Sequence, residues 1–395
     1  MSRPYDVIVA GLGAMGGAAC DQLAGRGLRV LGLDRYAPPH VLGSSHGESR
    51  IIREAYFEDP RYVPLVRRAY ECWSALERDT GRALLRITGG LMLGPPEGVL
   101  VSGVMRSAET HGLPYQRLRP AEVRRRFPAF AIAEPDVAIW EPRAGVLDPE
   151  ACVTAQLERA ARRGAELRPG VPAIAWRARG AGVEVDTPRG TEHATHLVLA
   201  TGAWLSELLK NPALPLTIER MAVYWFEPAA HPEWFAPERF PIWIWEHEPG
   251  RFFYGSPRLG RGIKAARHHE GDLCTLENVR REVSEHEAIA MRELLERHLP
   301  DAAGPLLGTA TCLYANTPDH DFVIDRHPDH QQVLIVSACS GHGFKFAGVI
   351  GEVIADLVID RRSNFDLAPF RLSRFAGAGA PGRAGSGQAG SGVGE

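Results

Sequence analysis

The feature that most restricts the fold of this chain is a strand, glycine turn, helix and second strand at its start. Residues 5–34 read YDVIVAGLGAMGGAACDQLAGRGLRVLGLD, with a buried apolar strand at residues 7–10. The turn carries a GxGxxG pattern. Gly11 permits the tight turn, Gly13 lets the backbone approach a pyrophosphate, and Gly16 lets the helix pack on the strand. This pattern predicts a Rossmann-type dinucleotide-binding unit, in which the helix N-terminus faces the phosphates.

The second strand ends in Asp34, about 20 residues after the glycines, where a carboxylate accepts hydrogen bonds from ribose hydroxyls. An acid at this position argues against NADP but does not separate NAD from FAD. The chain then enters a Gly/Ser/His-rich loop instead of continuing a regular alternation of helices and strands. An apolar strand ending in Ala200, Thr201 and Gly202 follows much later, and residues 331–359 repeat the strand, glycine turn and helix. Three separated segments thus predict one nucleotide-binding domain, a layout more frequent for FAD than for NAD.

The intervening segments are rich in aromatic and β-branched residues, as in RMAVYWFEP, FPIWIWE and RFFYGSP, and predict a second, sheet-based domain that caps the cofactor. Trp225, Trp243 and Trp245 are expected in the core of that sheet rather than in a substrate cage. The predicted boundaries are 1–85, 148–215 and 321–375 for the FAD-binding domain, 86–147 and 216–320 for the substrate domain, and 376–395 for a disordered Gly/Ala/Ser-rich tail.

Composition excludes several classes of partner. With 45% hydrophobic and 24% charged residues and a net charge of −3, the chain has the balance of a globular protein without a basic surface for nucleic acid or anionic lipid. The six cysteines form no CxxC pair, so free thiols are expected instead of disulfides or a zinc site. The chain starts without a signal-like segment and contains no run of about 20 apolar residues, so we expect a cytoplasmic protein with a small-molecule partner.

Motifs along nearly the whole chain resemble the monomeric sarcosine oxidase and N-methyltryptophan oxidase family of covalent flavoproteins. These motifs are GLGAMG, GSSHGESRIIREAY, YVPLVRRAYECW, YGSP with GIKAARHH, CLYANTPDHDFVID, SGHGFKFAGVIGEV and NFDLAPFRLSRF, and they cover about residues 4–375 in the family's order. The resemblance implies a two-domain α/β fold of the D-amino-acid oxidase and glutathione reductase type.

The family implies a role for one cysteine in particular. Its C-x-Y cysteine carries the flavin as a thioether at the 8α carbon, and Cys312 occupies that position. Without the motif, a small buried hydrophobic residue is the ordinary interpretation of a cysteine, and it stays our interpretation of the other five.

The resemblance also implies the reaction. Family members oxidise secondary amino acids by hydride transfer to flavin N5, hydrolyse the resulting imine, and reduce O₂ to hydrogen peroxide. Sarcosine or N-methyltryptophan would yield formaldehyde and the demethylated amine. The family is monomeric, so a monomer is expected here.

The remaining site residues follow position by position. Arg53 and Lys345 match the pair that binds the substrate carboxylate, although RIIRE also reads as a surface helix face. Lys264 matches the lysine that activates oxygen over N5. The loop before Lys264 is one residue shorter than in the family, which assigns the active-site histidine to His268 rather than His269.

Other positions match residues that face the substrate or flavin. Tyr254 and the segment 243–245, with Ile244 as its candidate, are placed over the substrate. The expected flavin contacts are Ser44, His46, Arg50, Thr201, Gly202, His342, Gly343 and Lys345. Ser45 stands where some family members have a second histidine. The backbone at His342 and Gly343 is expected to stabilise negative charge at the pyrimidine end of the flavin.

Three alternatives remain open on sequence grounds. The same fold could oxidise a cyclic secondary amino acid such as proline, pipecolate or a biosynthetic intermediate. A flavin-binding subunit without turnover is disfavoured, because the predicted catalytic and attachment residues are all present. An NAD-dependent dehydrogenase is supported by the glycine motif and Asp34 alone.

Overall fold

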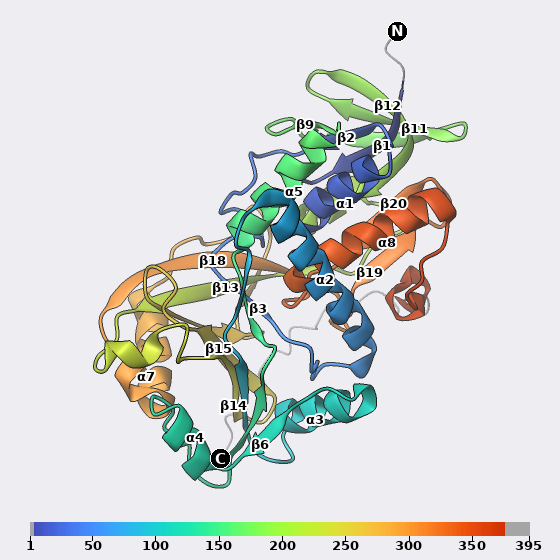
Figure 1. Cartoon of the computed structure of the whole chain (residues 1–395). Helices are drawn as coiled ribbons and strands as arrows, with labels where there is room; N and C mark the ends of the chain where they lie inside the picture. The colour runs from blue at the N-terminus through green and yellow to red at the C-terminus, as the bar shows by residue number, and fades with distance from the viewer. Residues whose placement is uncertain (1–3, 376–395) are drawn as a thin grey trace, which may run out of the picture.

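The computed structural model describes residues 4–375, so the predicted tail at 376–395 lies outside the described residues. Two large sheets dominate the molecule (Figure 1). One sheet carries the glycine turn. The other lies beneath it in the view of Figure 1, with helices α4 (Pro120–Arg126) and α7 (Glu285–His298) at its outer side. No helix within residues 4–375 has both the length and the apolar character needed to cross a bilayer.

The nucleotide-binding sheet has eight strands. Its parallel centre is β20–β12–β1–β2–β9, and β10, β11 and β19 extend it with antiparallel pairs. The strands are β1 (Tyr5–Ala10), β2 (Val30–Leu33), β9 (Glu166–Arg168), β10 (Ala175–Arg179), β11 (Gly182–Thr187), β12 (Gly190–Leu199), β19 (Val323–Arg326) and β20 (Val333–Ser337). Helix α1 (Ala14–Gly25) packs against α5 (Pro149–Arg162) and α8 (Ala347–Asp360). The apolar runs form strands here because helices cover the sheet and bury them.

The second sheet has nine strands in the order β17–β13–β16–β15–β14–β5–β7–β6, with β18 paired to β13. They are β5 (Gly90–Gly94), β6 (Gln116–Leu118), β7 (Val137–Glu141), β13 (Thr217–Phe226), β14 (Ile242–Glu248), β15 (Arg251–Ser256), β16 (Ile263–His268), β17 (Asp272–Cys274) and β18 (Leu306–Asn316). The same segments also contain α3 (Val99–His111), α4 (Pro120–Arg126) and α7 (Glu285–His298), which the prediction of a β-rich domain did not include.

Smaller elements connect the two sheets. A three-stranded sheet joins β3 (Arg50–Ile52), β8 (Gly145–Leu147) and β4 (Leu85–Ile87), and α2 (Val63–Thr80) contacts α5 and α8. A short helix α6 (Leu205–Leu208) follows the turn after β12, and single 3-10 turns lie at Pro60–Tyr62, Gly202–Trp204, Pro232–Phe235, Pro300–Ala302, Phe344–Phe346, Ala368–Phe370 and Leu372–Phe375. Each sheet draws on segments distant in sequence. The predicted domain boundaries stay a prediction.

The three tryptophans singled out in the sequence are core residues. Trp225, Trp243 and Trp245 are at most 2% exposed, and the last two pack in one apolar cluster with Phe253. The expectation that the whole segment 243–245 lies near the substrate is wrong for both tryptophans. Side chains alternate along β14, so only Ile244 reaches the cavity described below.

The glycine turn shows that its residues have different roles. A Cβ added at Gly16 would lie 1.7 Å from the Gly11 carbonyl oxygen, a backbone atom that has no room to move. A Cβ at Gly13 would meet only the Ser45 hydroxyl, at an ordinary 3.5 Å. Gly16 therefore permits packing of α1 on β1, whereas Gly13 leaves space above the turn.

We predict that Gly16→Ala lowers the free energy of unfolding by about 2 kcal/mol or more, because overpacking outweighs the gain of roughly 1 kcal/mol from alanine in a helix. Gly13→Ala is the matched control and should stay within about 1 kcal/mol of the parent. Urea unfolding followed by circular dichroism measures both. Equal stability of the two variants would contradict the packing argument.

Candidate active site

One long cavity runs between the two sheets, from the glycine turn to the start of α8. Its lining includes residues from both sheets and from the loop after β2. Of the residues predicted from sequence, it brings together Gly11, Gly13, Asp34, Ser44, Arg50, Arg53, Thr201, Gly202, Ile244, Tyr254, Lys264, His268, Cys312, His342, Gly343 and Lys345. Gly16 and His46 lie outside the lining.

The nucleotide end is formed by the turn and by the end of β2. The carboxylate of Asp34 accepts the backbone N–H groups of Leu12 at 2.7 Å and Tyr36 at 2.8 Å, which fixes it beside the turn. Burial raises the pKa of Asp34. Thr201 also lines the cavity, and its buried hydroxyl has no hydrogen-bond partner among residues 4–375. These two groups suit the hydroxyls and phosphates of a dinucleotide.

Cys312 lies on β18 in the middle of the cavity. Its Sγ is 3.3 Å from a guanidinium nitrogen of Arg50 and 3.6 Å from Nε2 of His46. Burial by itself raises the pKa of the thiol, but the charge of Arg50 and the hydrogen bond with His46 outweigh it and lower the pKa of Cys312 to about 6. A thiolate is therefore favoured at neutral pH.

Two cations, the half-buried Arg50 and the buried Lys264, flank this sulfur without carboxylate partners. Arg50 donates to the backbone carbonyls of Ser49 and Ser44, and Lys264 Nζ donates to those of Gly47 at 2.6 Å and Ser49 at 2.8 Å. Burial, and then the charge of Arg50, lowers the pKa of Lys264 to about 7. Neither cation forms an ion pair within the described part of the chain. This region therefore favours an anionic or electron-rich ligand.

Arg53 stands at the far end of the cavity and is only 2% exposed. The alternative of a surface helix face is wrong, because residues 50–52 form strand β3 and the arginine turns inward. Its guanidinium donates to both carboxylate oxygens of Glu58, at 2.6 and 2.8 Å, and to the Ala55 carbonyl at 2.9 Å. Burial opposes ionisation of Glu58, but Arg53 outweighs it and lowers the pKa of that carboxyl.

Lys345 supplies a second cation at the same end. Its Nζ donates to the His342 carbonyl at 2.6 Å and to the Tyr56 hydroxyl at 3.3 Å. Burial and the charge of Arg53 lower its pKa to about 7. The Lys345 carbonyl accepts the indole N–H of the buried Trp73 at 2.8 Å, which fixes this turn before α8.

The second sheet supplies the wall that faces these cations. Ile244 and Tyr254 are cross-strand neighbours on β14 and β15, and His268 follows at the end of β16. Burial lowers the pKa of His268 well below its ordinary value, so its imidazole is neutral. His269 turns away and bonds Glu219 at 3.1 Å, outside the cavity. The alternation of the strand therefore agrees with the choice of His268 over His269.

Sequence reasoning missed Tyr314 and Glu58, which also line the cavity. Tyr314 lies two residues after Cys312 on β18, so period-two alternation could have identified it. Its hydroxyl is 3.5 Å from Nδ1 of His268. Glu58 is in a loop and gave no comparable signal.

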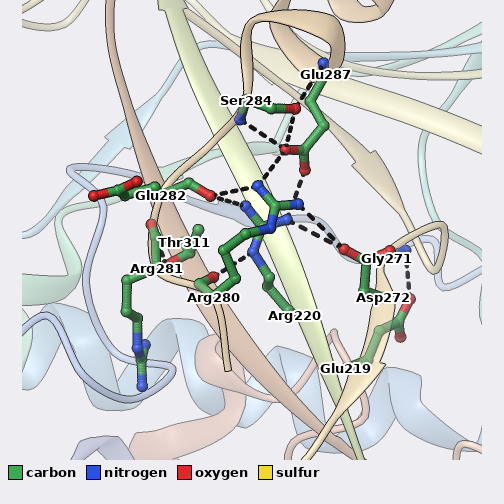
Figure 2. Close-up of polar contacts among 10 residues, drawn as sticks. All are labelled: Glu219, Arg220, Gly271, Asp272, Arg280, Arg281, Glu282, Ser284, Glu287 and Thr311. Carbon is green, nitrogen blue, oxygen red and sulfur yellow. Dashed lines mark hydrogen bonds and ion pairs between the residues drawn. The ribbon is translucent and has the colours of Figure 1, made fainter. Parts of the chain in front are cut away.

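A polar cluster on the opposite face of β13 supports the wall that holds Cys312 (Figure 2). Met221 pairs with Cys312 and lines the cavity, whereas its neighbour Arg220 turns to the other side and meets Glu287 at 2.6 Å. Arg280 meets the other oxygen of Glu287 at 2.8 Å. The Arg281 side chain points away from this group in Figure 2 and donates to the Leu42 carbonyl at 2.9 Å. The loop before α7 is therefore tied both to β13 and to the loop after β2.

The cavity fits FAD on three observations. The glycine turn leaves backbone space, the Thr201 hydroxyl lacks a partner among residues 4–375, and the cations Arg50 and Lys264, which have no carboxylate partners, stand beside Cys312. The remaining space beyond Cys312, between Arg53, Lys345 and Tyr254, is available for a substrate.

Comparisons with known proteins agree with this geometry. The model of the FAD dependent oxidoreductase family (DAO) matches residues 6–357. The chain is 45% identical over 382 residues to monomeric sarcosine oxidase of Streptomyces avermitilis, covering 96% of this chain and 100% of that protein. It is 36% identical over 373 residues to N-methyl-L-tryptophan oxidase of Yersinia pestis (strain Pestoides F), covering 94% and 99%.

Among solved structures, NikD, an unusual amino acid oxidase essential for nikkomycin biosynthesis, superposes with a TM-score of 0.82 at 25% identity and covers 94% of this chain and 98% of its own. The two-domain α/β prediction is confirmed, and the NAD-dependent alternative is wrong. The chain belongs to the DAO family of FAD-dependent oxidoreductases and, within it, to the group of monomeric sarcosine and N-methyltryptophan oxidases.

Proposed function

We propose that the protein is an FAD-dependent oxidase of secondary N-methyl amino acids such as sarcosine or N-methyltryptophan. The observation that carries this proposal is the buried Arg53 and Lys345 pair at the end of the FAD cavity, because two cations there suit an amino-acid carboxylate. The balanced reaction is R–NH–CH₃ + O₂ + H₂O giving R–NH₂, formaldehyde and H₂O₂. When bound, FAD would supply the two-electron acceptor for the amine and the electron donor for O₂.

The chain's own residues hold and shield the reactants. Arg53 and Lys345 bind the carboxylate, while Ile244 and Tyr254 cover the substrate and limit the entry of water. The neutral imidazole of His268 is available to accept a proton from the substrate amine. Lys264, held by two backbone carbonyls, supplies positive charge where oxygen is reduced.

We further propose that FAD is attached to Cys312 through a thioether. The low pKa of this thiol and its contact with Arg50 support the proposal, since the thiolate is the nucleophilic form. Attachment would replace one hydrogen of the flavin 8α methyl group by the sulfur, and the two electrons released would reduce the flavin and then pass to O₂, giving H₂O₂. By similarity to the monomeric relative, the protein acts as a monomer on a small amine and O₂.

The experiment that tests the function is a panel of sarcosine, N-methyltryptophan, proline and pipecolate, with formaldehyde and H₂O₂ measured together. We expect both products in equal amounts from an N-methyl substrate. H₂O₂ without formaldehyde from a cyclic substrate would move the assignment to a ring-oxidising enzyme, because ring oxidation releases no one-carbon product. No flavin reduction by any amine would contradict an oxidase.

Cys312→Ala should release the flavin. After acid precipitation, the parent should keep yellow colour in the pellet, whereas the variant should leave all of it in the supernatant. Cys339→Ala is the matched control, since Cys339 lines the same cavity but its sulfur contacts the Ala315 N–H instead of a guanidinium. Colour retained in the Cys312→Ala pellet would rule out this attachment site.

Binding of an amine-free carboxylate such as acetate should weaken as pH rises through about 7. Burial has lowered the pKa of Lys345 to about 7, so its ammonium is present below that pH and lost above it. We expect a rise in Kd of roughly tenfold from pH 6 to pH 9, read from the flavin absorbance.

Lys345→Met should abolish most of the change in Kd for acetate with pH. Lys264→Met should retain that change, because Lys264 contacts backbone carbonyls near Cys312. Glu141 also ionises near pH 7 but accepts the N–H groups of Glu54 and Ala55 outside the cavity. An unchanged slope in Lys345→Met would therefore assign the titration elsewhere.

A further inference from the structure

Tyr56 connects both cations of the substrate end, yet it does not line the cavity. Its ring lies 4.4 Å from the guanidinium carbon of Arg53, and its hydroxyl lies 3.3 Å from Nζ of Lys345. The side chain is fully buried. Its position links two groups that approach the cavity from different parts of the chain: Arg53 directly follows β3, and Lys345 lies in the turn before α8.

The direction of the hydrogen bonds around this hydroxyl follows from His342. The Nε2 atom of His342 lies 3.0 Å from the His320 carbonyl oxygen, which can only accept, so Nε2 carries the hydrogen. Burial lowers the pKa of His342 to about 3, so the ring is neutral and Nδ1 has a free lone pair. Tyr56 lies 2.6 Å from that Nδ1 and must therefore donate its only hydroxyl hydrogen there.

The lone pairs of the Tyr56 oxygen consequently face Lys345. Burial raises the pKa of Tyr56 well above its ordinary value, so the hydroxyl keeps its hydrogen. One ammonium hydrogen of Lys345 is directed at the hydroxyl and another at the His342 carbonyl, which leaves the third for the cavity. The ring of Tyr56 meanwhile makes a cation–π contact with the guanidinium of Arg53.

We propose that Tyr56 is a positioning residue for substrate binding, which aims the Lys345 ammonium and the Arg53 guanidinium at one carboxylate. This inference rests on the proposed function, since it assumes that the two cations bind a carboxylate. Tyr56 acts through Lys345 and Arg53 and does not itself touch the substrate.

Tyr56→Phe separates the hydroxyl from the ring. It removes the acceptor for Lys345 and leaves the ring beneath Arg53. We expect Kd for acetate and KM for the substrate to rise about tenfold, with kcat within about threefold, because loss of one charge-assisted hydrogen bond weakens binding without altering the reacting atoms.

Tyr62→Phe is the matched control. Tyr62 is buried in the same aromatic cluster, with its ring 4.9 Å from that of Tyr56, but its hydroxyl donates to Asp321 at 2.6 Å. It removes a buried hydroxyl without touching either cation, so Kd for acetate should stay within about twofold. An equal loss in both variants would assign the effect to general packing and overturn the proposal.

A double-mutant cycle with Lys345→Met provides the decisive test. If Tyr56 acts through Lys345, Tyr56→Phe should change Kd for acetate by less than about twofold once the lysine is absent. A full and additive loss in that background would overturn the proposal. Because acetate binding requires no turnover, a parent protein that binds acetate but oxidises no amine would contradict the proposed function only, whereas a parent that does not bind acetate would overturn both.

Discussion

The site depends on positive charge that is held in the cavity without carboxylate partners. Arg50 and Lys264 are held by backbone carbonyls beside Cys312, and Lys345 is held by a carbonyl and a hydroxyl. Removing a cation from water costs several kcal/mol unless it is paired, so neutral oxygens compensate these groups only in part. The depressed pKa values of both lysines and of Cys312 are consequences of that arrangement. A cavity with this electrostatic character is arranged for an anionic ligand and disfavours a neutral one.

The thiol and its neighbouring guanidinium come from segments that are distant in sequence. The sulfur of Cys312 is carried by β18, and Arg50 begins β3 after the loop that follows the nucleotide-binding strand β2. Ser44 donates to the Leu313 carbonyl, and the Leu313 N–H donates to Gly43 at 3.3 Å, so this loop is fastened to β18 itself. The fold thereby brings the thiol and the guanidinium together.

Local rules predicted the parts of the structure that depend on neighbours in sequence. The glycine spacing with Asp34 identified the nucleotide end, because a strand, turn and helix define it within 30 residues. The family motifs identified the cavity residues that carry the proposed chemical roles, including Cys312 and Lys264. Neither the glycine spacing nor the family motifs could predict contacts that depend on tertiary packing.

Three examples show the limit. The sequence favoured the core for Trp243 and Trp245 but also placed the segment 243–245 near the substrate, and only the strands that flank β14 decide that Ile244 alone of the three lines the cavity. Helix α3 was absent from the predicted β-rich segment, although its sequence VLVSGVMRSAETH has a mixed apolar pattern. The pairing of Glu58 with Arg53 joins two residues five apart through a loop whose shape no propensity defines.

The Arg53–Glu58 pair also has a consequence for how strongly a substrate can bind. An incoming carboxylate finds Arg53 already satisfied by Glu58, so the gain on binding is the difference between two similar interactions. The full attraction remains at Lys345, which lacks an acidic partner among residues 4–375. Arg53, Glu58 and Lys345 together carry one net positive charge when the lysine is protonated, which matches a single carboxylate. In the proposed function, Glu58 would thus moderate the ground-state affinity of Arg53 for a monocarboxylate, and tight binding of the ground state alone would not speed the reaction.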